Sequence, residues 1–222
     1  MKIHLQKELE KLKVRILSLG AMVEERVHMA IQAVHDRDAK LAVKIIKSDN
    51  EINANEVEIE EECLKVLALH QPVAVDLRFI IAVIKINNDL ERIGDQAVNI
   101  ADRVRYIARK PQVKVPLDYT PMMEETESML RESLDALVNL DSDLAYKVRS
   151  RDDVVDRETR HIYDGIKLAV REEPKLVGYM VNFFLVSRHL ERIADLATNI
   201  AEEVIYLVEG EILRHRVNEE KQ

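Results

Sequence analysis

The sequence predicts an all-α protein made of two tandem three-helix bundles, and three observations support this prediction. Glycine and proline number only ten among the 222 residues, where average usage would give about 27. Turns must therefore be few and the elements long. Apolar residues recur at steps of three and four along most of the chain, and one long segment occurs twice. The formal net charge of −8 argues against a generally basic nucleic-acid-binding protein.

The first half begins with two long helices. Apolar side chains follow one another at helical spacing from Leu5 to Val34, which indicates one amphipathic helix. Asp38 then suits the N-cap of a second helix that ends near Leu69. Helices of this length are typical of a bundle, in which each helix buries one apolar stripe.

A third helix and a linker complete the first half. Pro72 suits the first turn of a helix that continues to about Arg109. The next stretch holds three of the five prolines and shows no helical period, so we interpret it as a linker. We therefore expect a first bundle at residues 1–110, a linker at 111–121 and a second bundle at 122–222.

The second half repeats the first. Its apolar pattern predicts a helix around Met123 to Leu137, a helix from about Ser142 to Arg171, and a last helix from Pro174 to about Glu209. The segment LERIGDQAVNIADRVRY, which starts at Leu90, aligns with LERIADLATNIAEEVIY, which starts at Leu190, and more than half of the positions are identical. A duplicated three-helix unit explains this self-similarity.

The repeated segment carries a pair of carboxylates in each copy. Glu91 and Asp95 stand one helical turn apart and opposite the apolar stripe of their helix, and Glu191 and Asp195 repeat the arrangement. Like charges at this spacing repel each other, and a cation between them would remove the repulsion. Nearby polar residues that could support such a site are Asn99, Asn199, Arg92 and Arg192.

A second set of oxygen-bearing side chains lies on the middle helix of each half. Asp49 with Asn53, and Asp152 with Asp156, are again one turn apart and flank the apolar stripe. If the middle and last helices are neighbours, each half brings two such pairs to one groove. Such a hard, oxygen-rich site suits magnesium, manganese or oxidised iron better than zinc. This preference does not identify the metal, so iron, manganese, zinc and magnesium all stay candidates.

Three interpretations of these acidic residues stay open at this point. They form metal sites of a non-enzymatic adaptor, the metal centre of a carboxylate-ligated di-metal enzyme, or the solvated face of a metal-free helical scaffold. The sequence contains no glycine-rich phosphate loop and no nucleophile elbow. Its single cysteine, Cys63, falls in an apolar stripe. We therefore do not expect an enzyme.

Taken together, the motifs resemble those of the PhoU family. The resemblance covers nearly the whole chain and rests on ERIGD and ERIAD in the last helices, on DNEIN and DDVVD in the middle helices, and on QPVAVDLR at residues 71–78. Membership implies two tandem three-helix bundles. It also implies multinuclear metal clusters, of iron in some members, at these acidic motifs.

The resemblance further implies a cytoplasmic regulator, often a homodimer, that represses the phosphate-starvation regulon when phosphate is plentiful. Its expected partners are the ATPase subunit of the phosphate ABC transporter and a sensor histidine kinase. We expect the protein to associate with the membrane only through these partners. The charged N-terminus and the absence of a long apolar run agree with a protein that is not exported.

Two residues depart from the family pattern. Asn53 stands where the pattern has an acid, so we expect the first site to bind metal more weakly than the second. Gly178 stands opposite Arg78 of the first half, so we expect the two halves to differ in their partner contacts.

Overall fold

The computed structural model describes residues 2–110 and 117–210, and within these ranges it contains helices and no strand, which confirms the all-α prediction. The first half contains α1 (Lys2–Asp36), α2 (Ala39–Lys47), α3 (Asp49–His70) and α4 (Ala74–Ile107). The second half contains α5 (Thr120–Asn139), α6 (Ser142–Arg149), α7 (Asp152–Glu172), a short 3₁₀ segment (Pro174–Leu176) and α8 (Val177–Glu209). None of the described helices is long and apolar enough to cross a membrane.

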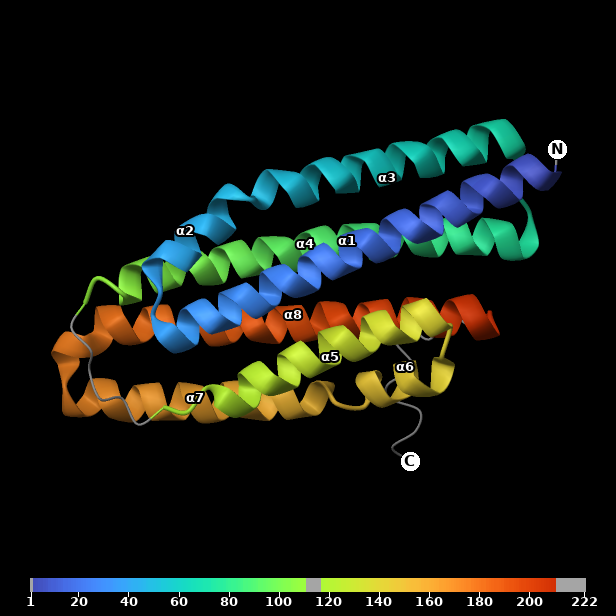
Figure 1. Cartoon of the computed structure of the whole chain (residues 1–222). Coiled ribbons are helices and arrows are strands. Elements are labelled where there is room, and N and C mark those ends of the chain that lie inside the picture. Colours follow the sequence, from blue (N-terminus) through green and yellow to red (C-terminus); the bar gives the residue numbers. More distant parts are fainter. Residues whose placement is uncertain (1, 111–116, 211–222) are drawn as a thin grey trace, which may run out of the picture.

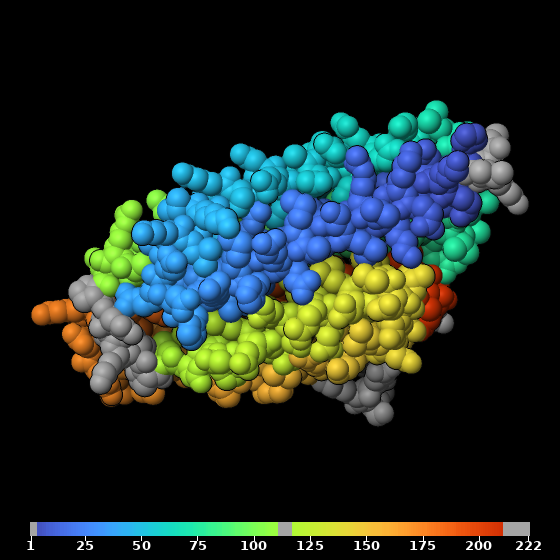
Figure 2. All heavy atoms as spheres, in the orientation of Figure 1, coloured from blue at the N-terminus to red at the C-terminus, as the bar shows by residue number. Residues whose placement is uncertain are grey.

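The two halves lie side by side as two layers, and α4 and α8 form the seam between them (Figure 1). These two helices run antiparallel. Near one end of the seam the Lys85 ammonium lies 3.0 Å from both carboxylate oxygens of Glu203, and further along His189 Nδ1 lies 2.9 Å from Gln96 Oε1. On one face of the molecule α1 also lies against α5 (Figure 2).

The antiparallel register brings the two repeated motifs to the centre of the seam. The pairs Lys85–Glu203 and Gln96–His189 place Ile93 at about the same level as Ile193. Both isoleucines are fully buried. The buried residues of both halves join in one hydrophobic core. The acidic residues next to these isoleucines therefore stand on helices that the hydrophobic core holds in place.

The middle helix of the first half is broken, which corrects the prediction of one continuous helix. Asp38 does cap α2, because its carboxylate accepts hydrogen bonds from the backbone N–H groups of Lys40 and Leu41 at 2.8 and 3.1 Å. However, α2 ends at Lys47. The Ser48 hydroxyl donates to two carbonyl oxygens of the preceding turn, at 3.0 Å each, and a new helix starts at Asp49. Serine hydroxyls compete with the backbone ladder in this way.

The second half is broken at the equivalent place. The Ser150 hydroxyl donates to the carbonyl oxygen of Lys147 at 2.7 Å. Arg151 then reaches α5, where its guanidinium binds Glu125 at 2.6 Å and Glu132 at 2.8 Å. The new helix starts at Asp152, so both breaks put an acidic residue first in the following helix. The apolar period continues through both breaks, and the sequence pattern therefore did not reveal them.

The other helix boundaries differ from the predicted ones by a few residues at most. Pro72 lies just before α4 and not in its first turn, because the helix begins at Ala74. Residues 111–116 of the expected linker lie outside the described part of the chain. Its last two residues, Thr120 and Pro121, belong to the first turn of α5. The last helix ends at Glu209 as predicted, and Gly210 closes it with a positive φ of 79°.

Gly94 marks a close approach between α4 and α3. A Cβ atom on Gly94 would lie 3.0 Å from Cδ1 and 3.3 Å from Cγ2 of Ile52. The repeat has Ala194 in place of Gly94 and Val155 in place of Ile52, and both are buried. The second half thus carries the extra methyl group on the last helix and the smaller side chain on the middle helix.

The paired difference between Gly94 with Ile52 and Ala194 with Val155 predicts that substitutions at positions 94 and 52 affect stability non-additively. In the wild type, Gly94→Ala gains roughly 0.5–1 kcal/mol of helix propensity but overpacks against Ile52. In an Ile52→Val background the overpacking is relieved, so we expect Gly94→Ala to be more favourable there by about 1 kcal/mol. Urea unfolding of the four proteins of the double-mutant cycle measures this. Ile59→Val, on the same helix, is the control background, and equal effects of Gly94→Ala in all three backgrounds would contradict the packing argument.

Candidate functional site

The predicted site residues come from four helices and gather at two places. In the first half, Asp49 opens α3 and faces the stretch of α4 that carries Glu91 and Asp95. In the second half, Asp152 opens α7 and lies near the stretch of α8 that carries Glu191. The N-terminus of a helix carries a partial positive charge, which stabilises these carboxylates where they stand. The helix breaks therefore serve the sites directly.

The first site combines carboxylates that raise one another's pKa. Partial burial raises the pKa of Glu91, and the charges of Asp95, Glu56 and Asp49 raise it further. Partial desolvation and the charge of Asp49 raise the pKa of Asp95, which is exposed. Asn53 donates a hydrogen bond of 3.3 Å from its amide nitrogen to Asp49 Oδ2. The site thus concentrates negative charge that the neighbouring protein only partly compensates.

Glu56 is a member of the first site that the sequence pattern did not single out. It lies one turn beyond Asn53 on α3, and its charge acts on Glu91. Burial and the neighbouring charge of Glu60 raise its own pKa. Glu56 and Glu60 form an i, i+4 pair that could have been found by spacing alone, but the second half has no equivalent pair. Glu56 supplies a carboxylate close to the position where Asn53 lacks one.

The second site is more strongly perturbed. Burial raises the pKa of Asp152 to about 6, with further contributions from Asp195, Asp156, Asp153 and Glu191, in that order. The other three predicted residues of this half, Asp156, Glu191 and Asp195, thus all act on Asp152. Asp152 is the most affected because it lies between the carboxylates of its own helix and those of α8.

The two sites differ in the ion pairs that their carboxylates form with arginines. At the second site each of three acids has an arginine partner on its own helix: Arg160 lies 3.7 Å from Asp156, Arg192 lies 3.2 Å from Asp195, and Arg188 pairs with Glu191. At the first site Arg92 turns instead to Asp89, at 3.4 Å. The Arg160–Asp156 and Arg192–Asp195 pairs are exposed, so they can open at little cost when another cation approaches.

Several oxygen atoms at these sites lack a hydrogen-bond donor. Asp49 Oδ1 and Asn53 Oδ1 at the first site, and Glu191 Oε2 at the second, are buried and accept no hydrogen bond. An unsatisfied buried acceptor is costly, and a bound cation would satisfy it. Within the described residues no three histidine, cysteine, aspartate or glutamate side chains already stand in ligating geometry. The donor set therefore fits a hard cation, provided that side chains turn toward it.

The four supporting residues predicted from the sequence fall in different places. Arg192 contacts the second site through Asp195, whereas Arg92 contacts Asp89 and not the acidic pair beside it. Asn199 lines a hollow at the seam, together with Asp89 and Arg92 of α4. Asn99 is half-buried on α4. Only Arg192 thus forms an ion pair with a predicted metal-site residue.

Cys63 does not add a reactive group. It is buried in α3, and burial raises the pKa of its thiol to about 12. A thiol with such a pKa is protonated at neutral pH and is a poor nucleophile or metal ligand.

Two copies of a helical unit, each with carboxylates of two helices near one another, define a tandem-bundle protein with paired acidic sites. The PhoU domain model matches this chain twice, at residues 16–104 and 120–204. The chain belongs to the PhoU family.

Individual relatives agree with this assignment. The chain is 39% identical to a phosphate-specific transport system accessory protein PhoU homolog of Pseudomonas aeruginosa, over 94% of this chain and 86% of the relative. It is also 39% identical to the homolog from Aquifex aeolicus, over 97% of each chain. The crystal structure of PhoU from Pseudomonas aeruginosa matches with a TM-score of 0.89 at 38% identity, over 93% of this chain and 99% of that one. The phosphate transport system regulatory protein PhoU from Streptococcus pneumoniae matches with a TM-score of 0.83 at 30% identity, over 94% and 98%.

The raised pKa of Asp152 predicts a pH effect on stability. Its pKa is about 6 in the folded protein and about 3.9 in the unfolded chain. The folded state therefore binds the proton more tightly, and stability falls as the pH rises from about 4 to about 6. Because the group is only half-buried, we expect about 1 kcal/mol. In metal-free protein, Asp152→Asn should remove this loss of unfolding free energy, whereas Asp143→Asn, at the exposed start of α6, should retain it. Parallel pH profiles for wild type and Asp152→Asn would contradict the assignment.

Proposed function

We propose that this protein regulates phosphate uptake, represses phosphate-starvation genes when phosphate is plentiful, and binds metal ions at its two acidic sites. The observation that carries the proposal is the repeated juxtaposition of carboxylates from the middle and last helices in a chain with two PhoU domains. The names of the relatives, which describe accessory proteins of the phosphate-specific transport system, support the regulatory role.

The residues that would hold metal are the oxygen-bearing side chains that lie near one another on the middle and last helices of each half. In the first half these are Asp49, Asn53, Glu91 and Asp95, with Glu56 in reach, and in the second half Asp152, Asp156, Glu191 and Asp195. A cation bound by carboxylates of both helices would link the start of the middle helix to the last helix. The chain's own part is to hold these oxygens on rigid helices at the surface of the bundle.

We propose an adaptor and not an enzyme. The relatives are named as accessory or regulatory proteins. The expected partners are the ATPase subunit of the phosphate transporter and a sensor histidine kinase, met in the cytoplasm, with a homodimer as the working form. In this scheme a partner binds one acidic face of the protein, and this binding shifts the partner's equilibrium between two conformations of its interface. The shift can be no larger than the difference between the protein's affinities for the two conformations.

Metal analysis tests the sites. Protein purified without metal-affinity columns should contain iron, manganese, zinc or magnesium by mass spectrometry. We expect Glu91→Gln/Asp95→Asn to lose metal from the first half, Glu191→Gln/Asp195→Asn to lose it from the second, and the quadruple variant to lose both. Removing ligands should weaken the affinity by at least a factor on the order of 10–100.

The matched control is Glu58→Gln/Glu62→Gln, which removes two carboxylates one turn apart on α3. These residues pair with Arg15 and Lys65 and should leave the metal content unchanged. Circular dichroism should show equal helix content in all variants. Metal-free wild type that also fails to take up metal on reconstitution would contradict the metal sites and leave the regulatory role untouched.

A reporter assay tests the regulatory role. In a bacterial host that lacks its own PhoU, expression of this chain in phosphate-rich medium should lower the output of a phosphate-starvation promoter. The quadruple variant should lose most of this repression at equal protein level, and the Glu58→Gln/Glu62→Gln control should keep it. Full repression by the quadruple variant would show that metal at these residues is not required, and equal output with and without the wild-type chain would oppose the regulatory proposal.

A further inference from the structure

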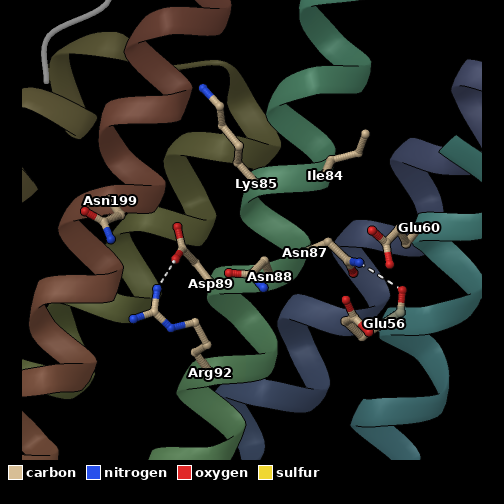
Figure 3. A pocket seen from close by; sticks show the side chains of 9 residues that line it. All are labelled: Glu56, Glu60, Ile84, Lys85, Asn87, Asn88, Asp89, Arg92 and Asn199. Carbon is tan, nitrogen blue, oxygen red and sulfur yellow. Dashed lines mark hydrogen bonds and ion pairs between the residues drawn. The ribbon is translucent and has the colours of Figure 1, made fainter. Parts of the chain in front are cut away.

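A polar hollow of about 460 Å³ opens between α3 and α4 of the first half and α8 of the second, beside the first acidic site (Figure 3). Glu56 and Glu60 line it from α3, and Asn199 lines it from α8. The remaining lining residues come from α4: Ile84, Lys85, Asn87, Asn88, Asp89 and Arg92. None of the site arguments above uses the hollow as a whole.

The charges in the hollow leave two carboxylates available to a ligand. The two basic residues of the lining are already engaged, since Lys85 binds Glu203 and Arg92 binds Asp89. Among the side chains of residues 4–110 and 117–210, no lysine or arginine forms an ion pair with Glu56 or Glu60. Burial and the charge of Glu60 raise the pKa of Glu56, as expected for carboxylates that lack a counter-ion.

Asn87 provides an independent sign that something is missing from the hollow. The residue is 1% exposed, and its amide nitrogen donates a hydrogen bond of 2.9 Å to the carbonyl oxygen of Glu56. Its amide oxygen is buried and accepts no hydrogen bond. In Figure 3 Asn87 reaches from α4 toward α3, between Glu56 and Glu60. A buried acceptor without a donor is costly and calls for a hydrogen-bond donor at this point.

We propose that this hollow binds an arginine side chain of a partner protein. Two carboxylates and an amide oxygen are all acceptors, and a guanidinium offers five N–H donors with a positive charge. The partly buried Ile84 can contact the aliphatic part of the arginine, and the amides of Asn88 and Asn199 at the hollow can bind the adjoining peptide backbone. The volume is far larger than a single metal ion requires.

The described part of the second half has no equivalent of this hollow, so each chain would take one such side chain. By the alignment of the repeats, the residues equivalent to Glu56, Glu60, Asn87, Asn88 and Asp89 are Thr159, Tyr163, Ser187, Arg188 and His189. Ser187 is also fully buried, but its hydroxyl donates to the carbonyl oxygen of Phe184 at 2.8 Å. The second half thus lacks both carboxylates and the unsatisfied amide oxygen.

The test uses a small arginine mimic, N-acetyl-arginine-methylamide, added to ¹⁵N-labelled protein in the presence of EDTA. We expect saturable shifts of the side-chain amide signals of Asn87, Asn88 and Asn199. The citrulline analogue, which has the same shape but no charge, should not produce them. Glu60→Gln should weaken the mimic's affinity roughly tenfold, since a charge-assisted bond is lost. The adjacent Glu61→Gln, exposed and outside the hollow, should leave the affinity unchanged.

Equal shifts with the citrulline analogue, no saturable shift, or equal effects of Glu60→Gln and Glu61→Gln would each overturn the proposal. A separate titration with MgCl₂ without EDTA covers the main rival: shifts of the Asn87 signal with Mg²⁺ but not with the mimic would assign the hollow to a metal ion. The inference rests on the proposed role as a protein that docks on partners. Its test needs neither the partner nor bound metal, so failure here is distinguishable from failure of the metal or reporter experiments.

Discussion

The antiparallel packing of α4 against α8 is the constraint on which the rest of this structure depends. It joins the two halves in one core and brings the central isoleucines of the duplicated motifs, Ile93 and Ile193, to the same level. The inner face of each motif is fixed in this seam, and the carboxylates of the same motif are left to face the middle helix of their own half. A chain with this duplication therefore presents two acidic sites on a shared rigid support.

The acidic residues are placed where the backbone helps to hold them. Asp49 and Asp152 each open a helix, so the partial positive charge of the helix start offsets part of the repulsion among the carboxylates. The compensation is incomplete, because the pKa values of Glu91, Asp95 and Asp152 stay raised. At the second site arginines pair with Asp156, Glu191 and Asp195 but leave the pKa of Asp152 raised, whereas at the first site the carboxylates continue along α3 to Glu56 and Glu60. The duplication has thus produced two sites of different character.

The sequence predicted the class of fold because helical period, the scarcity of turn residues and the repeat all act locally. It also predicted which carboxylates lie near one another, because Glu91 and Asp95 occupy the same positions of the repeated segment as Glu191 and Asp195. It missed the breaks at Ser48 and Arg151, where the apolar period continues although side chains end the helix. It missed the hollow around Asn87 because the hollow depends on how close α3 lies to α4, which is a tertiary property. Glu56 and Glu60 do have helical i, i+4 spacing, but the second half has no equivalent pair, so the repeat did not single them out.

The central claim is that carboxylates of the middle and last helices act together on a cation in each half. Anomalous X-ray diffraction from crystals soaked with Mn²⁺ tests it most directly, because the signal locates the metal independently of the protein atoms. The account predicts anomalous density in contact with Asp49, Glu91 and Asp95 in the first half and with Asp152, Glu191 and Asp195 in the second. Density bound to residues of one helix alone, or no density at either acidic site, would contradict it.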